Sequence, residues 1–291
     1  MSAAATLARA PARRSWLTLL RRTGPAGVAS ALVIVVATFV AAFGPMLAPF
    51  DSELGQLSNS YVGPVQVPGH LLGFDGAGRD LLSRLLVGAR TSMLGPLAVV
   101  VICMTLGTLL AVSGAWKRGG YDSVVSAGLD ILFAFPGILL AILAAAVFGA
   151  GLSAAALALS VAYTPYVARV LRGAALRERS QLYVSALEVQ GAGSLAICLR
   201  HLVPNMAPLI VAQATILFGY AMVDLAAISF LGLGVQPPRA DWGVMVNENQ
   251  SGVLQGYPLP AIAAGLCIVV VVVAFNVLGE RLYEQAQAER R

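Results

Sequence analysis

Charge is scarce in this chain. Only 11% of its 291 residues are Asp, Glu, Lys or Arg, and Lys117 is the single lysine. A soluble globular domain carries about a quarter of charged residues. Hydrophobic residues make up 58% of the sequence, and the mean hydropathy is +0.80. These values indicate an integral membrane protein. No ten-residue alternating strand pattern recurs, so we predict an all-α, polytopic membrane protein rather than a barrel.

Residues that build catalytic or metal sites are also few. The two histidines, His70 and His201, fall on segments that we place on opposite faces of the membrane, so they cannot share a site. No Ser/His/Asp set or metal-ligand set can be built from them. A phosphate-binding loop needs a lysine after a glycine-rich stretch, yet Lys117 follows Trp116. We expect no catalytic residue, no metal or cofactor site, and no ATP hydrolysis by this chain alone.

The three cysteines do not indicate a disulfide framework or a metal site. They lie in or beside apolar runs, without C-x-x-C spacing or a paired histidine: Cys103, Cys198 and Cys267. This spacing supports neither a disulfide scaffold nor a zinc site.

Six apolar runs are long enough to cross a bilayer, which takes roughly 20 residues per helix. They are Pro25 to Ala48, Thr91 to Ala115, Val124 to Gly149, Leu152 to Leu171, Asn205 to Leu233 and Leu259 to Gly279. We divide the chain into a tail 1–25, a first transmembrane helix 26–48, an external loop 49–90, a five-helix core 91–279 and a tail 280–291. A signal peptide also begins basic, but this first apolar run is too long for one, so we predict a retained span.

Basic residues lie beside the apolar runs, which indicates a role in orientation rather than in nucleic-acid binding. With the N-terminus in the cytoplasm, fifteen of the nineteen basic residues fall inside. Those left outside are Arg79, Arg84, Arg90 and Arg239. The positive-inside rule therefore predicts that both termini are cytoplasmic.

Two external segments carry sequence patterns of their own. In residues 70–90, leucines recur on one helical face with Arg79, Asp80 and Arg84 opposite, which predicts a helix at the interface that then turns into span two. The Gly76-Ala77-Gly78 stretch lacks the strand and spacing of a nucleotide site. Between spans five and six, a Gly- and Pro-rich loop contains Trp242, which we expect to anchor at the membrane interface. Either it caps the bundle or it contacts the solute.

Prolines and acids inside the spans are the remaining candidates for a pathway. Pro96, Pro136 and Pro165 should bend spans two, three and four. The bent helices either line a cavity or are kinked only to pack against their neighbours. Ionisable groups are costly in lipid, which makes Asp130 and Asp224 functional candidates. For Asp130 we favour the alternative of a first helical turn near the cytoplasmic interface, where the helix dipole stabilises a carboxylate. Asp224 is the deeper of the two, and we take it as a possible pathway-lining residue.

The segment from Arg169 to Pro208 is a charged island between two apolar runs. We predict two short helices, one within 180–189 and one at about 195–202 that ends ahead of Pro204, joined at Gly191 and Gly193. Such a structured loop can dock on a partner, although an interfacial re-entrant segment fits the pattern as well.

This loop resembles the cytoplasmic signature of the permeases of ATP-binding-cassette importers, which runs Glu-Ala-Ala, three residues, Gly, nine residues and a hydrophobic-x-Leu-Pro close. Here Ser185-Ala186-Leu187 stands at the triplet, Gly191 at the glycine and His201 to Pro204 at the close. Further stretches from about Thr23 to Leu282 resemble the C-type permease of oligopeptide and dipeptide importers. They are GPMLAPFD, HLLGFDGAGRDLLSRLLVGARTS, DILFAFPGILLAI, RHLVPN, SFLGLGVQPPRADWG and AFNVLGERL.

The resemblance implies the type I importer transmembrane fold and a set of partners. These are a second, B-type permease, two cytoplasmic ATP-binding-cassette subunits that bind the ATP, an extracytoplasmic peptide-binding protein and membrane lipid, with no nucleic acid. The chain would be a permease subunit that forms half of the translocation pathway. The loop 172–204 would couple it to the ATPases through Ser185, Ala186, Gly191, His201 and Pro204.

Other functions remain open at this point. The same permease pattern occurs in relatives that carry nickel complexes or glutathione. A stand-alone secondary carrier would be expected to show more intramembrane carboxylates and an internal repeat. A membrane enzyme would need a nucleophile or a set of metal ligands, and the sequence offers neither.

Overall fold

The computed structural model describes residues 24–288, where regular structure is helical apart from one isolated bridge between Phe74 and Asp80. The five N-terminal arginines of the expected tail 1–25 lie outside these residues, and so do Arg290 and Arg291.

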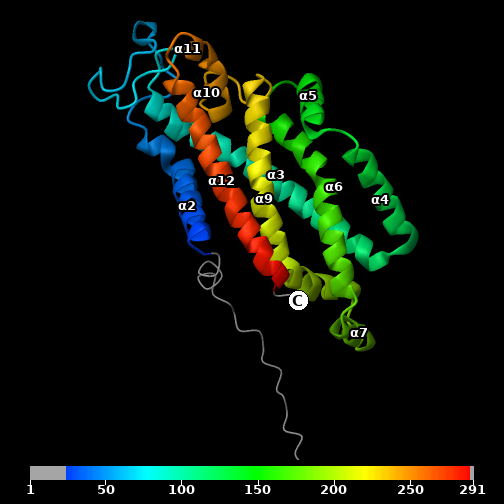
Figure 1. The fold of residues 1–291 in the computed structure, drawn as a ribbon. Coiled ribbons are helices and arrows are strands. Elements are labelled where there is room, and N and C mark those ends of the chain that lie inside the picture. Colours follow the sequence, from blue (N-terminus) through cyan, green and yellow to red (C-terminus); the bar gives the residue numbers. More distant parts are fainter. Residues whose placement is uncertain (1–23, 289–291) are drawn as a thin grey trace, which may run out of the picture.

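Within residues 24–288, five helices are long and apolar enough to cross a membrane (Figure 1). They are α2 Gly24–Leu47, α3 Leu81–Lys117, α6 Leu152–Arg179, the stretch 194–230 that contains α9 Val203–Phe230, and α12 Leu259–Ala288. A sixth span results if α4 Gly119–Phe133 and α5 Gly137–Phe148, which bend by 79° at their junction, are counted as one. The prediction of an all-α polytopic protein is confirmed.

Small residues let the main helices approach closely. The helix α3 packs on α6, and α9 packs on α12. At Gly107 of α3, an added Cβ would lie 2.5 Å from Val167 of α6, and at Gly279 of α12 it would lie 2.5 Å from Ile216 of α9. Glycines at such contacts are typical of membrane helix pairs, where packing rather than water exclusion drives association.

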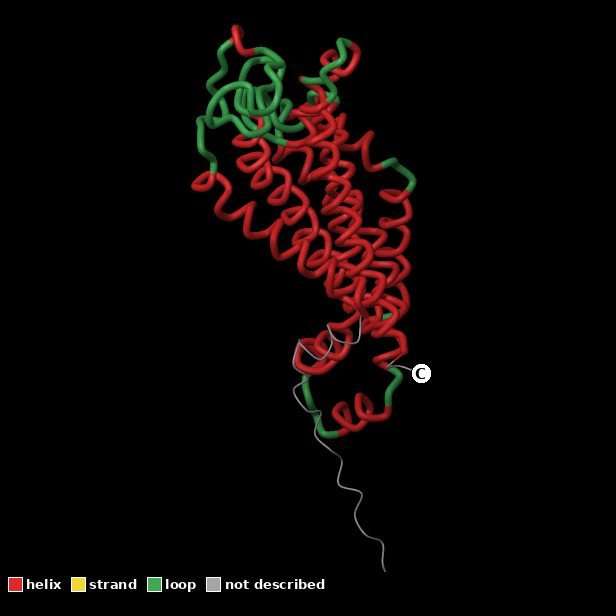
Figure 2. Tube along the Cα trace, turned by 60° about the vertical axis from the view of Figure 1, so that its left-hand side comes forward, coloured by secondary structure: helices red, strands yellow, loops and turns green. Residues whose placement is uncertain are grey.

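The two ends of the bundle differ. Figure 2 shows most loops gathered at one end. We call this end the cap, residues 48–80 and 231–258, with the 3-10 turn η1 Leu57–Asn59 and the short helices α10 Trp242–Glu248 and α11 Gln250–Leu254. The other end carries what we call the knob, residues 180–202, with α7 Leu182–Val189, α8 Ser194–Ile197 and a π-helical segment η2 Cys198–Leu202.

The expected interfacial helix before span two is not a separate element. Leu81 begins α3, which runs without a break through Pro96 to Lys117. The predicted polar face does not meet water either, because Arg79, Asp80 and Arg84 are buried. That prediction was wrong, since the two arginines pair with a residue of the cap more than 150 positions away, which a local pattern cannot reveal.

The prediction for Trp242 was wrong as well. Its side chain is 4% exposed, and its indole Nε1 donates a hydrogen bond to the Leu85 carbonyl at 3.0 Å. The residue therefore fastens the cap to α3 instead of anchoring in the lipid interface.

Only one of the three expected proline bends breaks a helix. Pro136 lies at the 79° junction of α4 and α5, whereas Pro96 and Pro165 lie inside the continuous helices α3 and α6. Pro204 does not end a helix either, because α8, η2 and α9 follow one another without a break. The Val203 amide donates to the Cys198 carbonyl, five residues back. This wider turn accommodates a proline that lacks an amide for the usual ladder.

Candidate functional site

The tip of the knob is a short helix with a defined stop. After α7 the chain turns at Gly191, whose φ of +79° lies in the left-handed region that favours glycine. The Gly191 amide donates to the Glu188 carbonyl, and the Ala192 amide donates to the Leu187 carbonyl, both at 3.0 Å. This is the Schellman pattern, which fixes the direction in which the chain leaves α7.

One side of the knob is buried in the bundle and the other is bare. Val184, Ile197 and Leu202 are buried against the helical core. Leu182 and Val189, in contrast, are 88% and 89% exposed. Ser185, Ala186 and Leu195 are exposed as well, and Pro204 is exposed at the second position of α9. The knob thus presents an apolar tip at the end of the molecule, while its base is held firmly.

A polar triad ties the base of the knob to two spans. The Tyr183 hydroxyl donates to Glu178 Oε1 at 2.7 Å, and Asn205 Nδ2 donates to the same oxygen at 2.9 Å. Burial and the hydrogen bond to the Glu178 carboxylate raise the pKa of Tyr183 to about 12. The His201 ring is half-buried, with its centroid 6.3 Å from that of Tyr183. The triad joins the end of α6, the knob and the start of α9. Sequence reasoning missed Glu178, Tyr183 and Asn205.

A second joint links α6 to the end of α3. The Arg179 guanidinium donates to the carbonyls of Ala115 and Trp116, and it stacks over the Trp116 ring at 4.6 Å. These carbonyls belong to the last turn of α3, whose orphan acceptors and negative dipole end favour a cation.

Two ion pairs attach α4 to α6. Arg172 forms a bidentate pair with Asp122, and Arg169 pairs with Asp130 at 2.6 Å. Asp130 lies near the C-terminal end of α4, so the expectation that it occupies a first helical turn was wrong. The helix α4 buries none of its residues within this chain.

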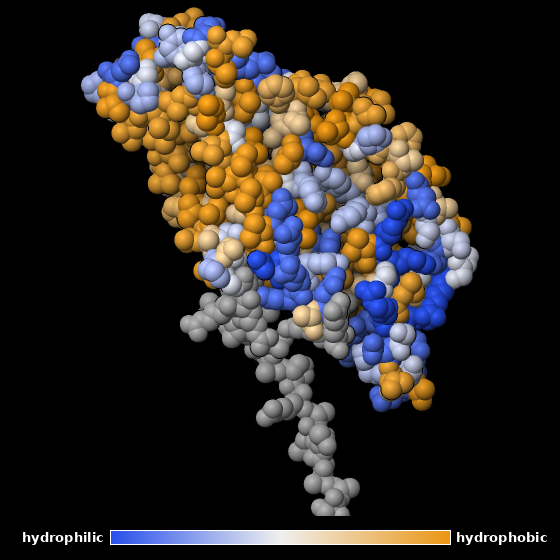
Figure 3. All heavy atoms as spheres, in the orientation of Figure 1, coloured by the Kyte–Doolittle hydropathy of each residue, from blue (hydrophilic) through white to orange (hydrophobic). Residues whose placement is uncertain are grey.

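Asp224 lies far from the knob. Twenty residues separate it from Pro204 along α9, which corresponds to roughly 30 Å. It is half-buried and accepts a hydrogen bond of 2.5 Å from the Tyr163 hydroxyl of α6. Four residues before it on α9, Tyr220 is exposed, and eleven residues before it Gln213 accepts from the Tyr166 hydroxyl at 3.3 Å. In Figure 3 hydrophilic residues interrupt the apolar surface in the middle of the face shown and continue down toward α7.

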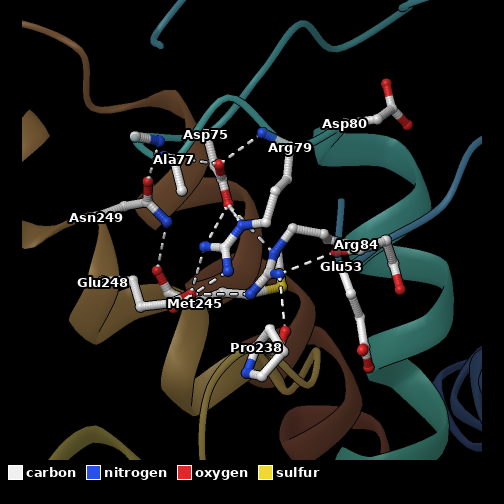
Figure 4. A network of polar contacts seen from close by, with 12 residues as sticks. Glu53, Asp75, Ala77, Arg79, Asp80, Arg84, Pro238, Met245, Glu248 and Asn249 are labelled. Carbon is white, nitrogen blue, oxygen red and sulfur yellow. Dashed lines mark hydrogen bonds and ion pairs between the residues drawn. The ribbon is translucent and has the colours of Figure 1, made fainter. Parts of the chain in front are cut away.

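A buried ion network binds the two segments of the cap to α3 (Figure 4). Arg79 donates to Asp75 Oδ2 and to both oxygens of Glu248. Arg84, with 0% exposure, donates to Glu248 Oε2 at 2.8 Å, and its Nε lies 3.2 Å from Asp75 Oδ2. Asn249 accepts from the Gly76 amide at 2.9 Å. Across residues 24–288, no group of three or more His, Cys, Asp or Glu side chains is arranged to hold a metal ion.

Comparison with known proteins places this geometry in a family. The family profile described as "Binding-protein-dependent transport system inner membrane component" matches residues 103–287. The glutathione transport system permease protein GsiD of Pectobacterium atrosepticum is 35% identical over 275 residues, covering 94% of this chain and 90% of that protein. GsiD of Escherichia coli O6:K15:H31 is 36% identical over 254 residues, covering 87% and 83%.

A solved structure has the same fold. The inward-facing MetNI methionine ABC transporter contains a chain that superposes with a TM-score of 0.56 at 22% identity, covering 70% of this chain and 96% of that one. At this identity the likeness concerns the fold alone. The family match and the GsiD relatives decide the assignment: the chain belongs to the binding-protein-dependent transport system inner membrane components, as a multi-pass permease subunit of an ABC importer.

Proposed function

We propose that this permease forms half of the translocation pathway of an ATP-driven importer and receives its energy through the knob. The observation that carries the proposal is the apolar tip of α7, where Leu182 and Val189 are exposed outside the membrane-spanning bundle. Large apolar side chains in such a position favour a protein partner. The partner expected for this family is a cytoplasmic ATP-binding subunit, and both termini of the chain would then lie in the cytoplasm.

Force applied to the tip would reach the pathway through continuous backbone. The segments α8, η2 and α9 form one uninterrupted run, and the triad of Glu178, Tyr183 and Asn205 ties the same base to α6. A rigid connection of this kind can convert movement of the ATPases into movement of the spans. Ser185, Ala186, Gly191, His201 and Pro204 belong to this coupling element.

A second permease would complete the pathway. The helix α4 buries no residue within the described part of this chain, and two exposed or partly exposed ion pairs link it to α6. Its free surface is available for a B-type permease. Two ATPase subunits and an external binding protein would complete the importer.

The solute that we propose is a short peptide. The curated relatives are named for glutathione, which is itself a tripeptide. Asp224 provides a carboxylate with a tyrosine neighbour at membrane depth, where it can meet the ammonium group of a peptide that passes. A nickel complex is the alternative cargo within the same class.

The coupling role can be tested in the assembled importer. We would express the chain with the second permease and the ATPase subunits and replace Leu182 and Val189 by Asp together. The expected result is loss of the ATPases from the purified complex and loss of peptide uptake. Leu254→Asp is the matched control, since Leu254 is 91% exposed at the opposite end. Full retention of the ATPases by the double variant would contradict the proposal.

A different class of function, a stand-alone secondary carrier, is tested by reconstituting this chain by itself. Uptake that follows a proton gradient, without any ATPase subunit, would favour the carrier. Calorimetry of peptides, glutathione and nickel complexes with the associated binding protein would identify the cargo.

A further inference from the structure

A groove opens on the side of the bundle where four helices meet. It has a volume of about 480 Å³ and lies between α2, α3, α9 and α12, within the size range of small-molecule sites. Its walls include Ala41 of α2, Leu94 and Leu97 of α3, and the stacked rings of Phe218 and Phe275, whose centroids are 3.9 Å apart.

Two polar side chains, Thr38 and Arg90, line the groove, and only Arg90 has no hydrogen-bond or ion-pair partner within residues 24–288. The Thr38 hydroxyl already donates to the Ile34 carbonyl of its own helix at 2.7 Å. Arg90 is exposed and forms neither an ion pair nor a side-chain hydrogen bond within residues 24–288. The Arg90 guanidinium, at the edge of an apolar groove, is therefore available to bind an anion.

The position of Arg90 along α3 sets the order of charge and apolar surface. Arg90 lies nearer to the cap, and Leu97 follows seven residues later, roughly 10 Å further along the helix. Long basic side chains near the end of a span extend toward the headgroup region, and a guanidinium binds phosphate oxygens in a bidentate way. The groove thus offers a cation at the headgroup level and apolar walls below it.

The surroundings of the groove are those of a lipid-facing surface. Figure 3 shows an apolar surface over α2 and α12, two of the helices that border it. Leu94 and Leu97 are about half exposed. An apolar groove at this depth is not a place for water, whereas acyl chains are present at high concentration in the bilayer.

We propose that this groove is a binding site for a phospholipid of the leaflet next to the cap, with one acyl chain between α2 and α3 and the phosphate on Arg90. The site is separate from the knob and from Asp224, so it stands whether or not the coupling proposal holds. A bound lipid would fill this groove and hold the first span against α3 and α12.

The test uses the full-length chain in phosphatidylcholine vesicles that contain phosphatidylglycerol with a diazirine in one acyl chain. After irradiation, labelled peptides are identified by mass spectrometry. The expected labels lie on the segments around Ala41, Leu97 and Phe218. A diacylglycerol with the same diazirine is the matched probe, because it has the acyl chains without the phosphate.

Variants of the cation separate binding of the phosphate from general contact with lipid. Arg90→Gln should reduce labelling by phosphatidylglycerol about fivefold, the effect of one basic side chain near an anionic headgroup, and leave labelling by diacylglycerol unchanged. Arg90→Lys should retain much of the labelling. Arg239→Gln is the control, since Arg239 is an exposed arginine in the cap.

A filled groove gives a second, independent readout. Ala41→Trp should suppress labelling at Leu97 by both probes, whereas Val269→Trp, on an exposed position of α12, should not. Even labelling over all exposed spans, or equal labelling of the Arg90→Gln and native chains, would overturn the proposal. So would efficient cross-linking of an Arg90→Cys variant to the second permease, because the groove would then be a protein contact.

Discussion

The cap and the knob, at the two ends of one bundle, differ in which side chains they bury and which they expose. At the cap end, Asp75 of the cap and Arg84 of α3 are fully buried, and both are paired with residues of the same chain. In the knob, Leu182 and Val189 are almost fully exposed. Charged side chains are buried at the cap end, and apolar side chains are exposed on the surface of the knob. In most proteins charged side chains are exposed and large apolar side chains are buried.

This difference shows which end is complete by itself. A buried charge is tolerated only when partners are fixed around it, so the two segments of the cap must assemble on each other and on the start of α3. Burial raises the pKa of the Asp241 carboxyl, which nevertheless caps α10 by accepting from the Gly243 and Val244 amides. The knob, in contrast, leaves its apolar tip for a surface that this chain does not supply.

The largest expected effect comes from breaking the cap. Arg84→Met removes a buried cation from between Asp75 and Glu248, which should destabilise the protein by about 3–5 kcal/mol. The measurement is the thermal midpoint of the purified chain in detergent. Arg239→Met, at an exposed position, should leave the midpoint unchanged. Equal midpoints for both variants would show that the network does not hold the cap.

A smaller effect is expected at the turn of the knob. Gly191→Ala places a Cβ at a φ of +79° and should cost about 1–2 kcal/mol of local stability, although nothing lies within 4 Å of that Cβ. Gly193→Ala is the matched control, since Gly193 has a φ of −66° and equally open surroundings. Hydrogen exchange of the α7 amides should increase in the first variant only. Equal exchange in both would mean that the turn conformation does not limit the opening of α7.

The triad at the base of the knob should be worth about 1 kcal/mol. Tyr183→Phe removes the hydroxyl from Glu178, which still accepts from Asn205. We expect the thermal midpoint to fall only slightly, whereas the number of peptides imported per ATP hydrolysed should fall clearly. Tyr121→Phe, which removes an exposed hydrogen bond to Ser113, is the control. An unchanged transport ratio would place the triad outside the coupling path.

The smallest effect on stability is expected at the tip itself. Leu182→Asp should change the stability of the isolated chain by no more than about 0.5 kcal/mol, because the side chain is almost fully exposed. The same single change should weaken retention of the ATPase subunits in the complex. A marked fall in the thermal midpoint of the isolated chain would show that the tip packs on its own protein, and the contrast with the cap would fail.

The spans could be predicted from the sequence because lipid imposes a simple rule on composition. Runs of about 20 apolar residues have to be helices, and the six expected runs all correspond to helical segments. The bend at Pro136 follows from the missing amide of proline. The spacing of Gly191 and Pro204 is enough to mark the loop that we propose as the coupling element, because a signature of this kind depends on local sequence alone.

The polar contacts could not be predicted in the same way. Glu248 is 164 residues from Arg84, and Asn205 is 27 residues from Glu178, so no local pattern joins them. The polar face of residues 79–84 suggests exposure to solvent because the period of a helix shows that a face is polar, not what it meets. Pro204 suggests a helix stop because a π turn that accommodates it leaves no mark in the sequence.

The continuity of α3 has a mechanical consequence. Its 37 residues span about 55 Å, with Arg84 bound to the cap near one end and the last carbonyls held by Arg179 at the other. A lever fixed at both ends cannot tilt at one without moving the other, and a tilt of about 10° displaces its far end by roughly 10 Å. The cap and the joint beside the knob are therefore parts of one lever, and a single distance measured from cap to knob would report on both.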